Sequence, residues 1–298
     1  MNKLDPQALF ERIAEDVHSE LHKNLFVIGS LAAAYQFQAQ LAGRAVTTKD
    51  ADVVVHPAGN VKSCREMADQ LFGCGWSRTA ECFPRSTPTP QAELQALRLY
   101  PPASHDYFIE FLNLPKQGQR EAKRWIPIEL ADGWYGLPSF RFLGLTALNR
   151  LTSDVGLEYA SPAMMALANL LAHPLVGTER IQSGMMHGVL RSAKDLGRVL
   201  ALARLAGRDE TEKWSDLWVA GLRDRFPSEW QELALHAGDG LRELLDDAAA
   251  LDEAHQTTDV GVLNGMGITT ENLRVTGTRL MQDVIEPVAD HARTRYSK

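Results

Sequence analysis

Two short motifs contain residue types that handle phosphate groups and divalent cations. Gly29-Ser30 follows the apolar run Leu25–Ile28, and Asp50-Ala51-Asp52 begins a second such run 20 residues after Ser30. A glycine turn lets backbone N–H groups approach a phosphate, and serine adds a hydroxyl donor. Two carboxylates two residues apart on a strand share one face and supply the hard oxygen ligands that suit Mg²⁺ or Mn²⁺. The spacing predicts a site for a triphosphate and its cation.

A third carboxylate would act as a base or complete the metal site. Glu110 stands in the middle of the apolar segment YFIEFLNL, where a buried charge is costly unless it is paired or bound to a metal. If this segment is a strand beside Asp50–Val55, Glu110 completes an acidic triad with Asp50 and Asp52. The alternative is an exposed residue on an edge strand.

The elements around these motifs predict a mixed α/β fold, in which an N-terminal mixed sheet flanked by helices precedes a helical region. Asn60 is a predicted N-cap for a helix that ends near Gly73. Further strands are predicted at residues 25–28, 50–55, 76–82, 94–99 and 107–114, a helix at 31–42, and long helices at 162–173, 189–206, 211–225, 229–237, 241–255 and 270–289. We therefore expect a domain at residues 1–155 and a helical domain at 156–298.

The motifs resemble the signature of nucleotidyltransferases of the DNA polymerase β superfamily, in which a Gly-Ser or Gly-Gly turn precedes an Asp-x-Asp pair. Thr48 stands two residues before the pair, as is usual in the AbiEii-type toxin branch, which the helical second half also resembles. The resemblance covers roughly residues 20–205. It implies a nucleotidyltransferase fold, an NTP substrate, Mg²⁺ or Mn²⁺, and a role as a toxin or phage-defence component with an antitoxin or other partner protein.

The resemblance also implies nucleotide contacts in the second half, where the sequence departs from the branch. The branch has a lysine seven residues after a proline, whereas here Pro162 is followed by Asn169. A later helix keeps Lys194-Asp195, but the second expected aspartate is Arg198. The candidate nucleotide-binding residues are therefore Gly29, Ser30, Thr48, Asn169, Lys194 and Asp195, and the candidate catalytic and metal residues are Asp50, Asp52 and Glu110.

Two functions follow from these residues. The first is an enzyme that transfers a nucleoside monophosphate from an NTP to the hydroxyl of an RNA end, a protein or a small molecule. The second is a catalytically silent protein of the same fold that binds a nucleotide or a partner protein. The changes at Asn169 and Arg198 favour the second function, whereas the retained Asp50/Asp52 pair favours the first, because like charges repel without a cation.

Composition and net charge limit the classes of binding partner that the sequence predicts. The chain of 298 residues has 45% hydrophobic and 23% charged residues and a net charge of −7, so no global positive field attracts polyanions or anionic membranes. Its one local basic cluster consists of Lys116, Arg120, Lys123 and Arg124, which is either a solvated face or a contact for an RNA acceptor. Without a signal peptide or a membrane-length apolar run, we expect a cytoplasmic protein.

Overall fold

The computed structural model describes residues 5–41, 50–88, 94–102, 104–105, 107–176, 179–182 and 186–294. The chain divides into two compact units. The first comprises residues 1–36, 45–144 and 150–160, and the second comprises residues 37–44, 145–149 and 161–298. The predicted mixed α/β class is confirmed, with a mixed sheet followed by a helical region. The predicted division between residues 155 and 156 stays a prediction about domains.

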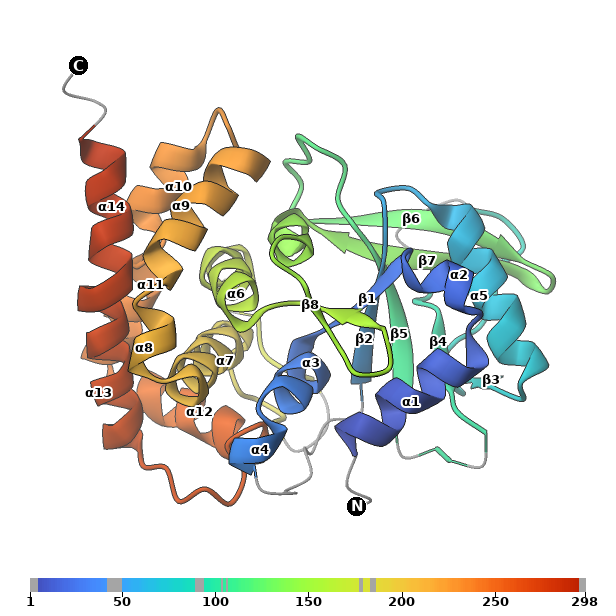
Figure 1. The fold of residues 1–298 in the computed structure, drawn as a ribbon, viewed down its shortest axis with the longest axis horizontal. Coiled ribbons are helices and arrows are strands. Elements are labelled where there is room, and N and C mark those ends of the chain that lie inside the picture. The colour runs from blue at the N-terminus through green and yellow to red at the C-terminus, as the bar shows by residue number, and fades with distance from the viewer. Residues whose placement is uncertain are drawn as a thin grey trace. The chain divides into compact units, whose positions relative to one another are not determined.

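The first unit contains a seven-stranded sheet in the order β3-β4-β5-β2-β1-β9-β8 (Figure 1). Strand β2 lies at its centre, antiparallel to β1 and parallel to β5. The strands are β1 (Leu25–Ile28), β2 (Asp50–Val55), β3 (Ser77–Arg78), β4 (Arg98–Tyr100), β5 (Phe108–Asn113), β8 (Leu151–Thr152) and β9 (Glu158–Tyr159). The helices near them are α1 (Pro6–Asp16), α2 (Ser19–His22), α3 (Gly29–Gln36) and α5 (Val61–Gly73). The two strands predicted at 76–82 and 94–99 are shorter or shifted.

The helix α5 forms where its sequence predicts it. The side chain of Asn60 accepts a hydrogen bond from the backbone N–H of Ser63, which satisfies one of the unpaired donors of the first turn. Its apolar stripe, which includes Cys64, Met67 and Leu71, is buried. This helix packs against β2 and so supports the strand that carries the two aspartates.

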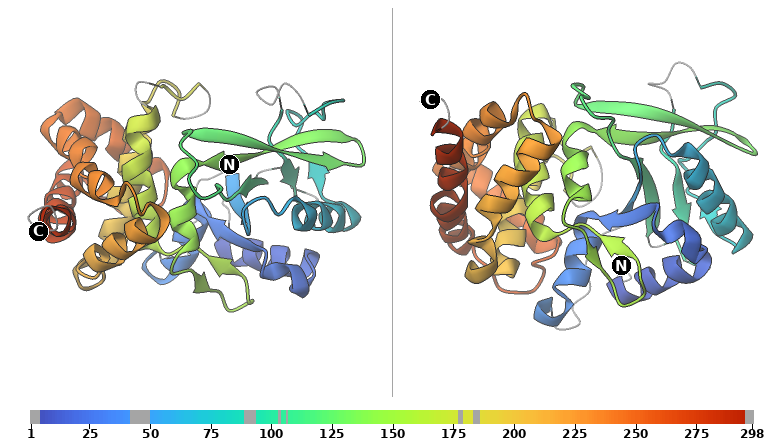
Figure 2. Two further views of the ribbon diagram at one scale, coloured as in Figure 1. Left: turned by 90° about the horizontal axis from the view of Figure 1, so that it is seen from above. Right: turned by 45° about the horizontal axis from the view of Figure 1, so that its top comes forward.

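A long hairpin of β6 (Lys123–Leu130) and β7 (Gly133–Phe140) was not expected from the sequence. It forms a separate two-stranded sheet (Figures 1 and 2). Isolated bridges pair Trp134 and Gly136 of β7 with Arg85 and Ala96, which lie outside the named strands. Proline usually marks the end of a strand, and β6 and β7 each contain one. Gly136 is needed because a Cβ there would lie 2.5 Å from the ring of Trp125 on the opposite strand.

The second unit is helical, and its described residues contain no strand. The predicted change from a mixed α/β region to a helical region is therefore confirmed. Helix α7 packs against α6, α8, α12 and α13, while α9 packs against α6, α10 and α14. The buried Trp218 donates its indole N–H to the carbonyl oxygen of Ala163, at 2.9 Å. The elements are α4 (Gln38–Leu41), α6 (Pro162–Val176), α7 (Arg191–Ala206), α8 (Arg208–Thr211), α9 (Trp214–Arg225), α10 (Trp230–His236), α11 (Asp239–Asp246), α12 (Ala248–Val260), α13 (Thr270–Leu280), a π-helical turn η3 (Met281–Ile285) and α14 (Glu286–Arg293). The short 3₁₀ segment η2 (Arg141–Ala147) crosses from the first unit into the second.

Three of the predicted long helices are interrupted. The segment at 241–255 divides into α11 and α12 at Asp247, whose carboxylate caps α12 by accepting bonds from the N–H groups of Ala249 and Ala250. The segment at 270–289 is broken by the π-helical turn, and Thr211–Arg225 is divided between α8 and α9. None of the described helices is long and apolar enough to cross a membrane.

Candidate active site

The turn between β1 and α3 brings Gly29 against the carboxylate of Asp52. Ile28 at the end of β1 is paired with Asp52 on β2. Gly29 is buried and has a φ of +73°, a conformation that L-residues with a side chain rarely adopt. A Cβ built on it would lie 2.8 Å from Oδ2 of Asp52. Glycine is therefore required here by the backbone conformation and by the neighbouring carboxylate.

Ser30 lies in the first turn of α3 and is partly exposed. The N-terminus of this eight-residue helix presents backbone N–H groups and a partial positive charge, which favour an anion. Within the described residues its hydroxyl makes no hydrogen bond, so it can donate to a bound ligand. The turn thus has the donors that the sequence predicts for a phosphate group.

Asp50 and Asp52 extend from the same face of β2. Asp50 is exposed and Asp52 is half-buried, while Ala51 between them is fully buried on the opposite face. Both carboxylates are thus accessible on the face that borders Gly29. This pair matches the donor set of a magnesium site that uses one or two carboxylates together with substrate phosphates.

Glu110 lies beside Asp52, because β5 pairs in parallel with β2 in a register that places the two residues opposite each other. On its other side, Glu110 is opposite Arg98 of the antiparallel strand β4. The Nε of Arg98 donates to Oε2 of Glu110 at 2.6 Å, and the pair is partly buried. The structure therefore adds Arg98 to the candidate site residues, beside Asp52 and Glu110 on neighbouring strands.

Arg98 is surrounded by carboxylates. Burial disfavours its charge, but Glu110, with smaller contributions from Glu81 and Asp50, outweighs burial and raises the pKa of Arg98. Its guanidinium carbon also lies 5.3 Å from the centre of the Phe108 ring. No local sequence signal distinguishes this arginine, because its partner Glu110 is 12 residues away and the pairing depends on strand register.

The three acidic residues do not form a ready metal cage. Within the described parts of the chain, no group of three His, Cys, Asp or Glu side chains is arranged to hold a metal ion. The ion pair with Arg98 engages Oε2 of Glu110, so this carboxylate is shared with an arginine. The role of Glu110 as a metal ligand stays a prediction.

The predicted nucleotide contact Thr48 lies outside the described residues. The contacts predicted in the second half, Asn169, Lys194 and Asp195, lie in the helical unit. Asn169 on α6 donates its side-chain amide to the carbonyl oxygen of Met165, at 2.7 Å. One amide hydrogen is therefore engaged within its own helix. Its contact with a nucleotide stays a prediction.

Lys194 and Asp195 lie in the first turns of α7. Burial raises the pKa of Asp195, and the nearby cations Arg198, Lys194 and Arg191 oppose this effect in that order. Arg198, which stands where the branch has a second aspartate, therefore supplies part of the charge around Asp195. Their role in nucleotide binding also stays a prediction.

The basic cluster of Lys116, Arg120, Lys123 and Arg124 is exposed in the first unit, and its last two residues begin β6. The ammonium of Lys123 lies 4.2 Å from the centre of the Trp125 ring, which is half-buried. The cluster thus combines exposed cations with a half-buried aromatic ring that Lys123 covers on one side. Tyr135 is fully buried and donates its hydroxyl to Asp132, so it belongs to the core.

The comparisons with known proteins identify no family. No family model matches the chain, and no curated protein matches it. Among solved structures, it is similar to the CD-NTase CdnG of Bradyrhizobium diazoefficiens in complex with GTP, with 12% identity and a TM-score of 0.22 over 99% of this chain and 89% of that one. A TM-score this low does not establish a shared fold.

Proposed function

We propose that this protein is a nucleotidyltransferase, which transfers a nucleoside monophosphate from an NTP to an acceptor hydroxyl. The observation that carries the proposal is the contact between the Gly29 turn and Asp52. It brings a phosphate-binding helix N-terminus directly beside two same-face carboxylates. A phosphate bound at the turn would therefore lie next to the ligands of its cation.

In this proposal the turn binds the triphosphate. The N–H groups at the start of α3 and the hydroxyl of Ser30 donate to phosphate oxygens, and the absence of a side chain at Gly29 lets the phosphate approach the backbone. Such fixed donors stabilise the negative charge that develops at the phosphate without reorganising during the reaction.

Asp50 and Asp52 would hold the cation, Mg²⁺ or Mn²⁺. A divalent cation neutralises phosphate charge and orients the leaving group. A cation between the two carboxylates would also reduce their mutual repulsion. Glu110 is the proposed base, since one of its oxygens is held by Arg98 and the other remains able to accept a proton.

The proposed reaction is an in-line displacement. The acceptor oxygen forms a bond to the α-phosphorus, the bond from this phosphorus to the bridging oxygen breaks, and pyrophosphate leaves. The hydroxyl proton passes to the Glu110 carboxylate. Arg98 keeps Glu110 directed to the same face as Asp52, so it positions the base rather than reacting.

The acceptor is an RNA end, a protein hydroxyl or a small molecule. The exposed cluster of Lys116, Arg120, Lys123 and Arg124 favours RNA, because cations beside the half-buried Trp125 suit a phosphate backbone with unstacked bases. A role as a toxin or phage-defence component, with an antitoxin or other partner and a cytoplasmic location, belongs to the same proposal and rests on the sequence resemblance.

A silent protein of this fold that binds a nucleotide or a partner protein is the second candidate. Two observations favour it. Asn169 is bonded to Met165 where the resembling branch has a free lysine, and Glu110 is paired with Arg98 rather than grouped with Asp50 and Asp52.

The deciding experiment follows label from each α-labelled NTP into total RNA, small molecules or the protein itself, with Mg²⁺ or Mn²⁺. We expect transfer by the wild-type chain and none by Asp52→Asn, which removes a ligand charge at nearly constant volume. The exposed Asp69→Asn on α5 is the matched control and should transfer normally. Binding of NTP without transfer to any acceptor would support the silent alternative, and unchanged transfer by Asp52→Asn would refute the site.

A further inference from the structure

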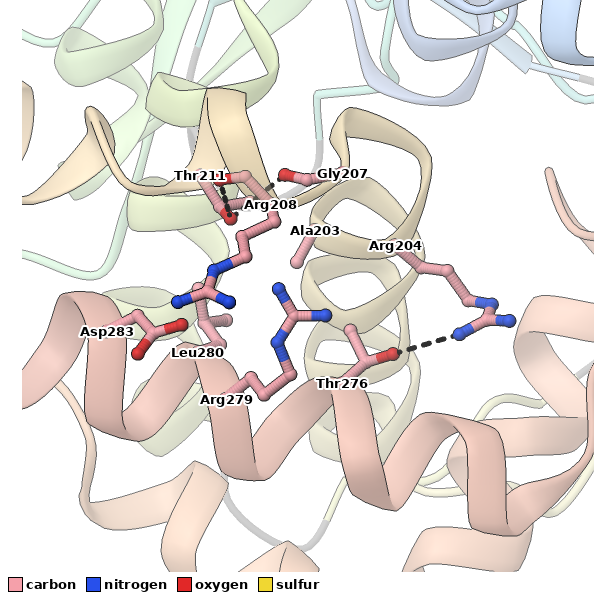
Figure 3. Close-up of a pocket in the computed structure, with 9 residues that line it drawn as sticks. All are labelled: Ala203, Arg204, Gly207, Arg208, Thr211, Thr276, Arg279, Leu280 and Asp283. Carbon is pink, nitrogen blue, oxygen red and sulfur yellow. Dashed lines mark hydrogen bonds between the residues drawn. The ribbon is translucent and has the colours of Figure 1, made fainter.

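A pocket of about 70 Å³ lies in the helical unit between α7, α8 and α13 (Figure 3). Three arginines line it: Arg204 at the end of α7, Arg208 on α8 and Arg279 on α13. Thr276 and the half-buried Asp283 complete its polar lining. Three guanidinium groups and one carboxylate thus line the pocket, in a chain with a net charge of −7, and Arg204 donates to the hydroxyl of Thr276 at 3.4 Å.

The pocket gathers positive charge that the described carboxylates offset only in part, through the pair of Arg208 with Glu212 and through Asp283. Figure 3 shows the heads of Arg208 and Arg279 pointing into the same space. Arg279 has no ion pair in the described parts of the chain. Arg208 donates its Nε to Glu212 at 2.6 Å, which leaves its terminal nitrogens for another acceptor. Two like charges aimed at one space are stabilised when an anion lies between them.

The far side of the pocket is formed by an unusual helical turn. Asp283 lies in the π-helical turn η3, and such turns occur frequently at functional sites. In a regular helix Arg279 and Asp283 would be neighbours one turn apart, yet no ion pair joins them in the described structure. Arg279 is thereby left available to a ligand.

We infer that this pocket binds inorganic phosphate. A guanidinium group presents paired N–H donors that match the oxygens of a phosphate, and Arg208 and Arg279 together give several donors around one anion. The volume of about 70 Å³ is far below the roughly 300–1,000 Å³ of pockets that enclose drug-sized ligands. It admits a group of the size of a single phosphate, and its lining residues belong to the second unit, whereas Gly29, Asp50 and Asp52 belong to the first.

The test titrates inorganic phosphate into the full chain without NTP, by calorimetry, at constant ionic strength maintained with chloride. We expect saturable binding to one site in the wild type and an affinity at least tenfold lower in Arg279→Gln. Arg293→Gln is the matched control, because it removes the same charge from an exposed residue of the same unit whose partner, Asp290, is on its own helix α14. It should bind phosphate as the wild type does.

Circular dichroism and the unfolding midpoint check that each variant is folded, and Arg279→Lys serves as a second variant. It keeps the charge but loses the paired donors, so its affinity should fall between those of the wild type and Arg279→Gln. No saturable binding by the wild type, equal affinity in Arg279→Gln, or equal weakening in Arg293→Gln would each overturn the inference. A failure of the protein to transfer nucleotides would neither support nor contradict phosphate binding in this pocket.

Discussion

Replacing Gly29 by alanine separates the two reasons for a glycine at the turn. The first is the backbone, since a residue with a side chain at a φ of +73° costs about 1–2 kcal/mol. The second is the contact of 2.8 Å between the new Cβ and Oδ2 of Asp52. Crowding of this kind costs about 1–3 kcal/mol when the neighbour cannot move. We therefore expect Gly29→Ala to lower the free energy of unfolding by about 2–5 kcal/mol.

Gly118→Ala is the matched control. Gly118 has a φ of +80°, but a Cβ there would meet nothing within 4 Å, so only the backbone cost of about 1–2 kcal/mol applies. The difference between the two variants measures the contact with Asp52. In an Asp52→Ala background the carboxylate is gone, and Gly29→Ala should then cost about as much as Gly118→Ala.

The assay is urea denaturation of the wild type, the three single variants and the double variant of Gly29 and Asp52, combined with the label-transfer measurement. The Asp52 carboxylate can relieve the contact by turning away, but the proposed metal ligand is then displaced and transfer falls. The contact therefore shows itself as lost stability or as lost transfer. Gly29→Ala with the stability of Gly118→Ala and with undiminished transfer would refute the reasoning.

Three further predictions test the site and its support. Ser30→Ala should weaken NTP binding by roughly tenfold to a hundredfold, the scale of a hydrogen bond to a charged group, and equal affinity in calorimetry would make the turn structural only. Arg98→Gln should lower the free energy of unfolding by about 1–2 kcal/mol without Mg²⁺, because it removes the partly buried 2.6 Å ion pair with Glu110. Millimolar Mg²⁺ should restore part of this loss. An unaltered midpoint of urea denaturation in either condition would count against this prediction. Burial and the neighbouring Arg150 lower the pKa of His56 from 6.5 to about 4, so only the unfolded chain takes up this proton between those values. Stability should fall as the pH is lowered from about 6.5 to about 4, and urea denaturation of His56→Gln should show a shallower fall; the same slope in both proteins would exclude His56 as its source.

Local sequence predicted the elements whose signals are contiguous. The apolar run Leu25–Ile28 followed by Gly29 predicted a strand and then a helix, and both form. The prediction succeeded because an apolar run and the glycine that ends it are recognisable within a few residues. The cap at Asn60 gave α5 at its observed bounds for the same reason. Strand β2 begins at Asp50 as expected, so the two aspartates lie on one face by the alternation of a strand alone.

The elements that the sequence did not reveal depend on partners far along the chain. Strands β6 and β7 contain Pro127, Gly136 and Pro138, which oppose a strand locally, yet they pair over their whole length because each supplies the other's hydrogen bonds. The division between α11 and α12 at Asp247 was not predicted either, because the segment is helical on both sides and only the cap at Asp247 separates the two helices.

For the candidate site, the residue types and the spacing of Gly29, Ser30, Asp50 and Asp52 were determined by the sequence, because a turn and a strand alternation are local properties. The tertiary structure decided which side chains meet. The register of β1, β2 and β5 brings both Gly29 and Glu110 beside Asp52. The register of β4 against β5 places Arg98 opposite Glu110. These pairings join segments many residues apart through backbone hydrogen bonds and buried faces, and a shift of one residue would turn every one of these side chains to the other face.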